Sequence, residues 1–76
     1  MITEAQVREA LVETAHSDAP KGWSLDFNFR EGGLDSLDHV TFLLALQEKH
    51  GFAFKDDDVA RLNTIRSVLD YAAGAQ

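Results

Sequence analysis

The chain has 76 residues, enough for one small domain and too few for a two-domain enzyme. Hydrophobic residues make up 45% of the sequence and charged residues 26%, a composition that excludes wholesale disorder. Seven basic against thirteen acidic side chains give a formal net charge of -6, which argues against nucleic-acid or anionic membrane partners and favours basic ones.

The sequence contains no cysteine, so neither disulfide bonds nor thiolate-bound zinc can supplement the packing of the core. No apolar run approaches the roughly 18 residues that a membrane-spanning helix needs. The N-terminal residues also lack the basic-then-apolar pattern of a secretory signal. We therefore expect a single domain over residues 1–76, located in the cytoplasm and monomeric.

A first helix is predicted to begin after Thr3 and to end close to His16. Thr3 and Gln6 have the spacing of a capping box, and Ile2 and Val7 that of a hydrophobic staple. Apolar residues recur at helical spacing along one face. They are Val7, Ala10, Leu11, Val12 and Ala15. The helix-breaking residues that follow are Ser17, Asp18, Pro20 and Gly22.

Apolar and polar residues alternate in the next segment, 23–29, as they would in a strand. The apolar positions are Trp23, Leu25, Phe27 and Phe29. Because no other segment offers a partner strand, we expect an extended loop whose aromatic side chains pack on a helical core. The Gly32-Gly33 pair then permits a sharp turn into the following helix.

The strongest helical pattern runs through Leu37 to a stop at Gly51, with Asp35 or Ser36 as its N-cap. Leu43 centres its apolar face, together with Val40 and Leu46. Two further leucines, Leu37 and Leu44, lie toward the edge of this face beside Thr41 and Glu48. We expect these two leucines to be partly exposed.

The C-terminal third of the sequence predicts two more helices. The acidic run Asp56-Asp57-Asp58 favours the start of a short helix through Leu62. Asn63 or Thr64 caps a last helix that ends near Gly74. The predicted fold is all-α: a small four-helix bundle with a long loop between helices one and two and a short third helix.

Little in the sequence indicates catalysis or a metal site. The three histidines, His16, His39 and His50, show no triad or metal-ligand spacing, so we expect neither catalytic nor metal-binding residues. His50 stands where an imidazole can cap the end of a helix. His39 is near Ser36 along the helix, which raises a His-assisted serine nucleophile, but no third residue is available to orient the imidazole.

Ser36 stands where a glycine-rich turn meets the N-terminus of an amphipathic helix. The exposed N–H groups and the helix dipole at that position favour an anion such as a phosphate ester on the serine. Asp35 and Asp38 oppose that phosphate but attract a basic partner enzyme. By spacing alone, Ser36 also suits the role of a simple N-cap.

Around this serine the sequence resembles the acyl carrier proteins of fatty acid and polyketide synthesis. The attachment motif reads Asp35-Ser36-Leu37-Asp38, and the resemblance continues over more than half of the chain. The further matching segments are Gly33, Ala45-Leu46, Phe52, Asp56-Asp57-Asp58, Asn63-Thr64-Ile65 and Asp70-Tyr71. The resemblance implies that Ser36 receives 4'-phosphopantetheine from coenzyme A, and that the thiol of this arm carries acyl groups as thioesters. The chain itself would not be an enzyme.

The resemblance also implies partners: a phosphopantetheinyl transferase, an acyl- or aminoacyl-loading ligase or transferase, and biosynthetic enzymes with basic docking patches. The implied docking residues are Asp35, Leu37, Asp38, Leu44 and Glu48. Positions that are commonly acidic in fatty acid carriers hold Thr41, Gln47 and Lys49 here, which favours a specialised carrier. The alternatives are a discrete aminoacyl or peptidyl carrier and an unmodified helical interaction module.

Overall fold

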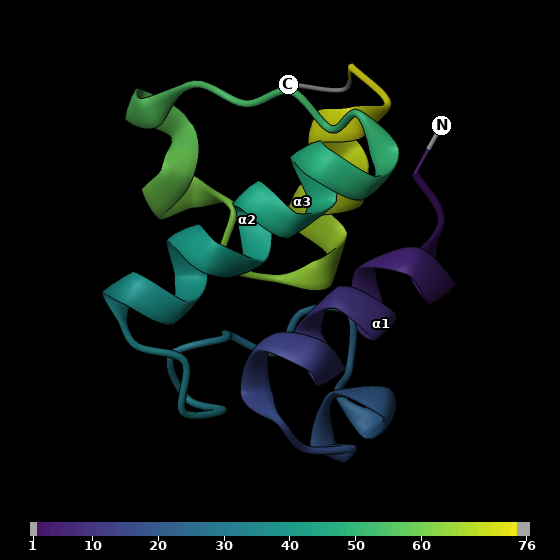
Figure 1. Ribbon diagram of the computed structural model, residues 1–76, viewed down its shortest axis with the longest axis vertical. Coiled ribbons are helices and arrows are strands. Elements are labelled where there is room, and N and C mark those ends of the chain that lie inside the picture. The colour runs from purple at the N-terminus through teal and green to yellow at the C-terminus, as the bar shows by residue number, and fades with distance from the viewer. Residues whose placement is uncertain (1, 75–76) are drawn as a thin grey trace.

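The computed structural model describes residues 2–74 and consists of helices joined by turns and loops (Figure 1). The α-helices are α1 (Glu4–Ala15), α2 (Ser36–His50) and α3 (Ile65–Ala72), and the 3-10 helices are η1 (Ala19–Gly22) and η2 (Asp56–Arg61). No strand occurs within residues 2–74. The predicted helical bundle is confirmed, with η2 as its short third helix. No helix among these residues is long and apolar enough to cross a membrane.

The helix ends follow from local sequence. Thr3 and Gln6 form the predicted capping box: the Thr3 hydroxyl accepts from the Gln6 N–H at 3.2 Å, and the Gln6 side-chain oxygen accepts from the Thr3 N–H at 3.1 Å. Thr64, not Asn63, caps α3. Helix α2 ends at Gly51, whose φ of 70° is the left-handed conformation that glycine adopts without strain.

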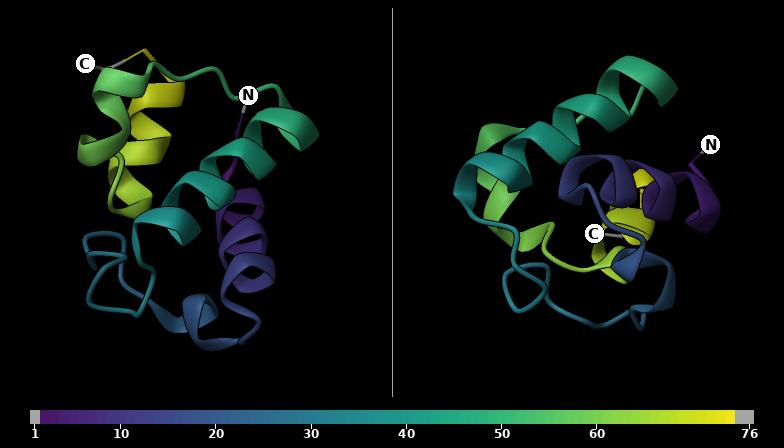
Figure 2. Two further views of the ribbon diagram at one scale, coloured as in Figure 1. Left: turned by 60° about the vertical axis from the view of Figure 1, so that its left-hand side comes forward. Right: turned by 60° about the horizontal axis from the view of Figure 1, so that its bottom comes forward.

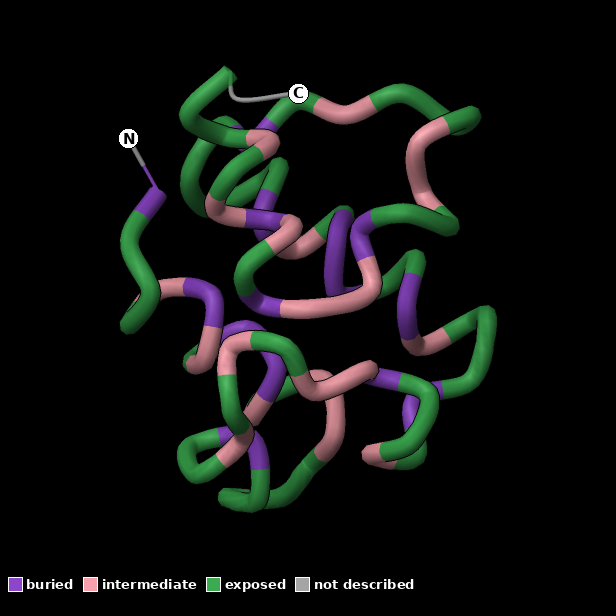
Figure 3. The backbone as a smooth tube through the Cα atoms, turned by 180° about the vertical axis from the view of Figure 1, so that it is seen from behind, coloured by how far each residue is buried: buried purple, intermediate pink, exposed green. Residues whose placement is uncertain are grey.

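The core lies between the three α-helices, and α1 packs against both α2 and α3. Figure 2 shows α2 running obliquely across α1, and Figure 3 marks the buried residues along the backbone in purple. The buried hydrophobic residues are Ile2, Val7, Ala10, Leu11, Phe29, Leu34, Phe42, Leu43, Leu46, Phe52, Leu62, Ile65 and Val68. The bundle therefore has one continuous apolar interior.

The apolar face predicted for α2 is partly wrong, because Val40 is 37% exposed. The buried residues of α2 are His39, Phe42, Leu43 and Leu46, at the i, i+3, i+4 and i+7 spacing of one helix face. The helix is thus rotated so that His39, a polar residue, occupies the place expected for Val40. A pattern that counts only apolar side chains misses this rotation.

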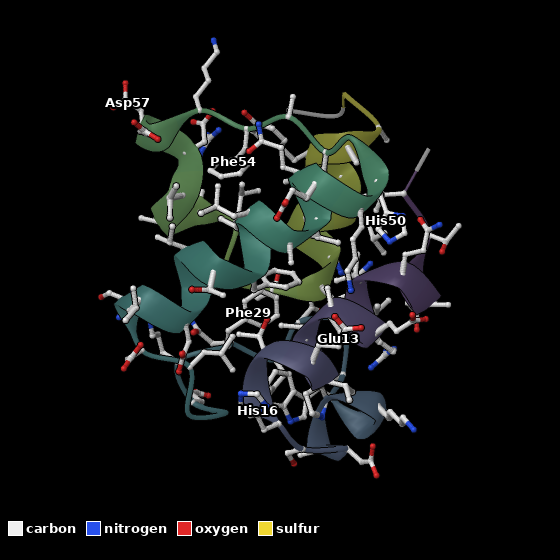
Figure 4. All side chains as sticks on the ribbon, in the orientation of Figure 1. Glu13, His16, Phe29, His50, Phe54 and Asp57 are labelled. Atoms are coloured by element: carbon white, nitrogen blue, oxygen red, sulfur yellow. The ribbon has the colours of Figure 1, made fainter. Side chains whose placement is uncertain are left out.

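The loop between α1 and α2 consists of η1 and successive turns, so the prediction of an extended segment is wrong. The Phe27 N–H donates to the Ser24 carbonyl at 3.2 Å, and the Gly32 N–H to the Phe29 carbonyl at 3.0 Å. The predicted aromatic packing is nevertheless confirmed. Phe29 is fully buried between α1 and α2 (Figure 4), and Trp23 and Phe27 are half-buried with ring centroids 5.0 Å apart.

Two arginines fasten this loop to the helices. The Arg8 guanidinium on α1 donates to the carbonyls of Pro20 at 2.9 Å and Trp23 at 2.7 Å. On α3, the Arg66 guanidinium donates to the Asp26 carboxylate at 2.7 Å, and this hydrogen bond holds the pKa of Asp26 below its ordinary value. Residues 20–26 of the loop are therefore held by bonds to both α1 and α3.

Gly32 makes room for the tryptophan. A Cβ atom on Gly32 would lie well inside contact distance of the Trp23 ring. We expect Gly32→Ala to displace that ring, to lower stability by about 1–3 kcal/mol as overpacking does, and to shift Trp23 fluorescence to the red. Gly22→Ala is the matched control, since a Cβ there meets nothing within 4 Å. Equal melting temperatures and spectra for the two variants would contradict this role of Gly32.

Candidate functional site

Ser36 is the first residue of α2, and its hydroxyl takes no part in capping that helix. Asp35 is the N-cap: its carboxylate accepts a hydrogen bond from the Asp38 N–H at 2.9 Å. The choice between Asp35 and Ser36 as the cap is thereby settled for Asp35. The Ser36 side chain is exposed and its hydroxyl is available for chemistry.

The turn before Ser36 is anchored to the core. Phe29 and Leu34, at its two ends, are both buried, and the Leu34 N–H donates to the Phe29 carbonyl at 3.1 Å. The Phe29 N–H donates to the Asn63 carbonyl at 2.9 Å, which ties the turn to the segment before α3. Gly33, as expected, has a positive φ of 100°. These bonds fix the position of Ser36 at the N-terminal end of α2.

Arg30, in the same turn, is a site residue that the sequence analysis missed. Its Nη2 donates to the Ser36 hydroxyl oxygen at 3.1 Å, and its backbone N–H donates to the Asn28 side-chain oxygen at 2.8 Å. Arg30 precedes Ser36 by six positions across the glycine pair. Side chains six positions apart do not touch in an α-helix or a β-strand, so only the folded turn reveals the contact.

His39 is not a base for Ser36. Its side chain is buried, 2% exposed, and its ring packs edge-on against Phe29. Its Nε2 lies 2.7 Å from the Leu62 carbonyl oxygen, and a carbonyl can only accept, so Nε2 carries the proton and donates. The imidazole therefore joins α2 to the segment after η2. Within residues 2–74 no group of three potential metal-ligating side chains is present.

The expected docking residues lie along the outer surface of α2 or at its start. Leu37 is 74% exposed and Leu44 is 48% exposed. Asp35 and Glu48 are exposed as well, whereas Asp38 is half-buried. At about 100° of rotation per residue, the two leucines and Glu48 share the side of α2 opposite its buried face. They lie farther from the core than the edge position predicted from the sequence.

Two clefts adjoin the start of α2. One, of about 250 Å³, is lined by Asn28, Arg30, His39, Ala60 and Asn63. The other, of about 260 Å³, lies between the end of α1, the loop and the turn before α2, and its lining includes Pro20, Trp23, Leu34 and Asp38. The first cleft shares Arg30 with the immediate surroundings of Ser36.

The similarity of this chain to known proteins identifies its family. The family model described as phosphopantetheine attachment site matches residues 5–72. The chain belongs to the acyl carrier protein family. Its cofactor is accordingly covalently attached 4'-phosphopantetheine, and carriers of this type work with biosynthetic enzymes.

Two solved structures of acyl carrier proteins are closely similar to this one, both from the actinorhodin polyketide synthase of Streptomyces coelicolor. The 3-oxobutyl form, an intermediate mimic, matches with a TM-score of 0.75 and 34% sequence identity, over 97% of this chain and 90% of that chain. The 3,5-dioxohexyl form, a triketide mimic, matches with a TM-score of 0.75 and 33% identity, over 99% of this chain and 91% of that chain.

The start of α2 fits a phosphodiester-linked arm. The Ser36 hydroxyl is exposed, is free of the helix cap and has an arginine within hydrogen-bond distance. The first N–H groups of a helix also favour an attached anion. The exposed hydroxyl and the neighbouring guanidinium thus suit the attachment of a phosphate ester at this position.

Proposed function

We propose that Ser36 carries the 4'-phosphopantetheine arm and that the chain, as one carrier domain, presents polyketide intermediates to successive enzymes. The observation that supports this best is that Asp35, and not Ser36, caps α2, which leaves the Ser36 hydroxyl exposed. When bound, the arm supplies a thiol that holds acyl groups as thioesters. The two similar structures support polyketide intermediates as the cargo.

In the loading reaction, the Ser36 oxygen attacks the phosphorus of coenzyme A that bears the pantetheine group. The new serine O–P bond forms as the pyrophosphate bond breaks, and adenosine 3',5'-bisphosphate leaves. The hydroxyl proton passes to a base of the phosphopantetheinyl transferase. Ser36 accepts rather than donates in its bond with Arg30, so its proton remains available for transfer.

The cleft beside Ser36 also suits a cargo that contains oxygen. Its polar lining residues include Asn28, Arg30 and Asn63. Their amide and guanidinium groups provide donors for keto or hydroxyl oxygens, whereas a saturated alkyl chain would desolvate them without compensation. This lining favours a polyketide over a long saturated fatty acyl chain.

Docking should combine charge at the start of α2 with the exposed leucines Leu37 and Leu44. We expect Asp35→Asn and Asp38→Asn to slow loading through weaker association with a basic transferase, and added salt to shrink the difference from the parent. Asparagine retains the capping ability of Asp35, so stability should be preserved. The matched control is Asp70→Asn on α3, which should load like the parent. Unchanged, salt-independent rates in both variants would show that docking does not use these charges.

The proposed function is tested by the intact mass of the chain after incubation with coenzyme A and a broad-specificity phosphopantetheinyl transferase. We expect one phosphopantetheine group per chain. An unmodified helical interaction module would retain its original mass under the same conditions. A second measurement compares acylation of the phosphopantetheinylated chain by a ketoacyl donor and by a saturated long-chain donor. Preferential acylation by the saturated donor would contradict a polyketide carrier.

A further inference from the structure

The contact between Arg30 and Ser36 is built into the fold. Phe29, immediately before Arg30, is fully buried, and the Asn28 side chain accepts from the Arg30 backbone N–H at 2.8 Å. The Gly33 N–H donates to the Arg30 carbonyl at 3.2 Å and closes the turn. The backbone of Arg30 is therefore fixed, and its side chain reaches Ser36 from a defined position.

Arg30 also differs from the paired cations of the chain. The ion pairs of the described residues involve Arg8, Lys21, Lys49, Arg61 and Arg66. Arg30 forms no ion pair with a carboxylate within residues 2–74, and its Nη2 is bonded instead to the uncharged Ser36 hydroxyl. A guanidinium that is engaged only with a hydroxyl retains donors for an anion placed on that hydroxyl.

The charges around Ser36 make such a cation useful. Asp35 and Asp38 flank the serine, and Glu31 follows Arg30 in the turn. A phosphodiester on Ser36 adds another negative charge among these carboxylates, which is unfavourable unless a cation is close. Arginine is well suited to this role because its planar N–H groups can bond two phosphate oxygens at once.

We propose that Arg30 binds the phosphodiester that joins the arm to Ser36, and so holds the base of the arm beside the cleft that Arg30 lines with Asn28, His39 and Asn63. This inference rests on the proposed attachment at Ser36. It assigns Arg30 as a positioning residue: the guanidinium recognises the phosphate anion and leaves the thiol end of the arm free to move between partner enzymes.

The first test needs no variant. In ¹⁵N-labelled parent protein, the side-chain N–H resonances of Arg30 should shift on conversion from the unmodified to the phosphopantetheinylated form, and the shift should shrink in high salt. The side-chain resonances of Arg66, which is paired with Asp26, should not shift. Arg30 resonances that are the same in both forms would overturn the proposal.

A second test observes the phosphate itself by ³¹P NMR of the modified chain. Arg30→Gln should shift the phosphodiester resonance and narrow it, because the base of the arm becomes more mobile. In Arg30→Lys, the position and width of this resonance should lie between those of Arg30→Gln and the parent. Lys49→Gln is the control with the same charge change, about 20 Å along α2 at about 1.5 Å per residue, and should leave the resonance unchanged. Equal spectra for the parent, Arg30→Gln and Lys49→Gln would contradict the assignment.

The two proposals fail in different ways. If Ser36 is not the attachment residue, the modified chain carries its phosphodiester elsewhere or none forms, which the mass of the chain and of its peptides reveals. If Ser36 is modified but neither the Arg30 resonances nor the ³¹P resonance responds as described, the attachment stands and the role of Arg30 is wrong.

Discussion

We expect Ser36→Ala to abolish attachment of phosphopantetheine while leaving the stability of the chain nearly unchanged. The variant lacks the hydroxyl oxygen that acts as the nucleophile in the proposed reaction, so loading should be lost completely. The helix cap, however, is the carboxylate of Asp35, and the Ser36 side chain is exposed. Removing it should change the free energy of unfolding by no more than about 0.5 kcal/mol, as is usual for surface substitutions.

Two further variants serve as controls, one for loading and one for the helix cap. Ser24→Ala, at an exposed serine of the long loop, should load at the parental rate. Asp35→Ala removes the real cap and should cost about 0.5–2 kcal/mol of stability. Intact mass measures loading, and urea unfolding measures stability. Loading of Ser36→Ala at the parental rate would refute attachment at this serine. A large loss of stability in Ser36→Ala would show that the Asp35 carboxylate does not suffice to cap the helix.

The largest effect on stability is expected for Phe29→Ala. Phe29 is fully buried, and its ring centroid lies 5.3 Å from that of Phe42 and 6.2 Å from that of Trp23. Truncating such a residue typically costs about 3–5 kcal/mol, which is most of the stability available to a domain of this size. The melting temperature should fall substantially in both the unmodified and the modified chain.

Phe27→Ala provides the comparison, because Phe27 belongs to the same aromatic cluster but is only half-buried. The melting temperature of Phe27→Ala should fall less than that of Phe29→Ala. Both variants should still accept the arm at a temperature at which they remain folded, since neither residue contributes an atom to the reaction. A Phe29→Ala variant as stable as the parent would show that the loop does not anchor the core.

The parts of the fold that could be predicted depend on neighbours in sequence. Thr3, Asp35 and Thr64 each cap the helix that follows, and a cap needs only residues two or three positions away. Helix existence and approximate ends were therefore predictable. The path of residues 23–33 was not, because it depends on bonds to distant residues such as that from the Phe29 N–H to the Asn63 carbonyl.

The candidate site divides in the same way. Ser36 stood out because a short motif surrounds it, and the exposed leucines of α2 followed from helical spacing. The burial of His39 depends on the Leu62 carbonyl, 23 positions away, which satisfies its imidazole. The contact of Arg30 with Ser36 depends on how the turn between them closes. Neither interaction leaves a periodic pattern in the sequence.

The central claim, that Ser36 carries the phosphopantetheine arm, is tested most directly by locating the arm within the modified chain. Trypsin cleavage after Arg30 and Lys49 releases the peptide 31–49, whose hydroxyl side chains are those of Ser36 and Thr41. Fragmentation of this peptide in a mass spectrometer should place the whole added mass on Ser36. Added mass on Thr41 or on any other peptide, or a chain that gains no mass from coenzyme A and the transferase, would contradict the claim.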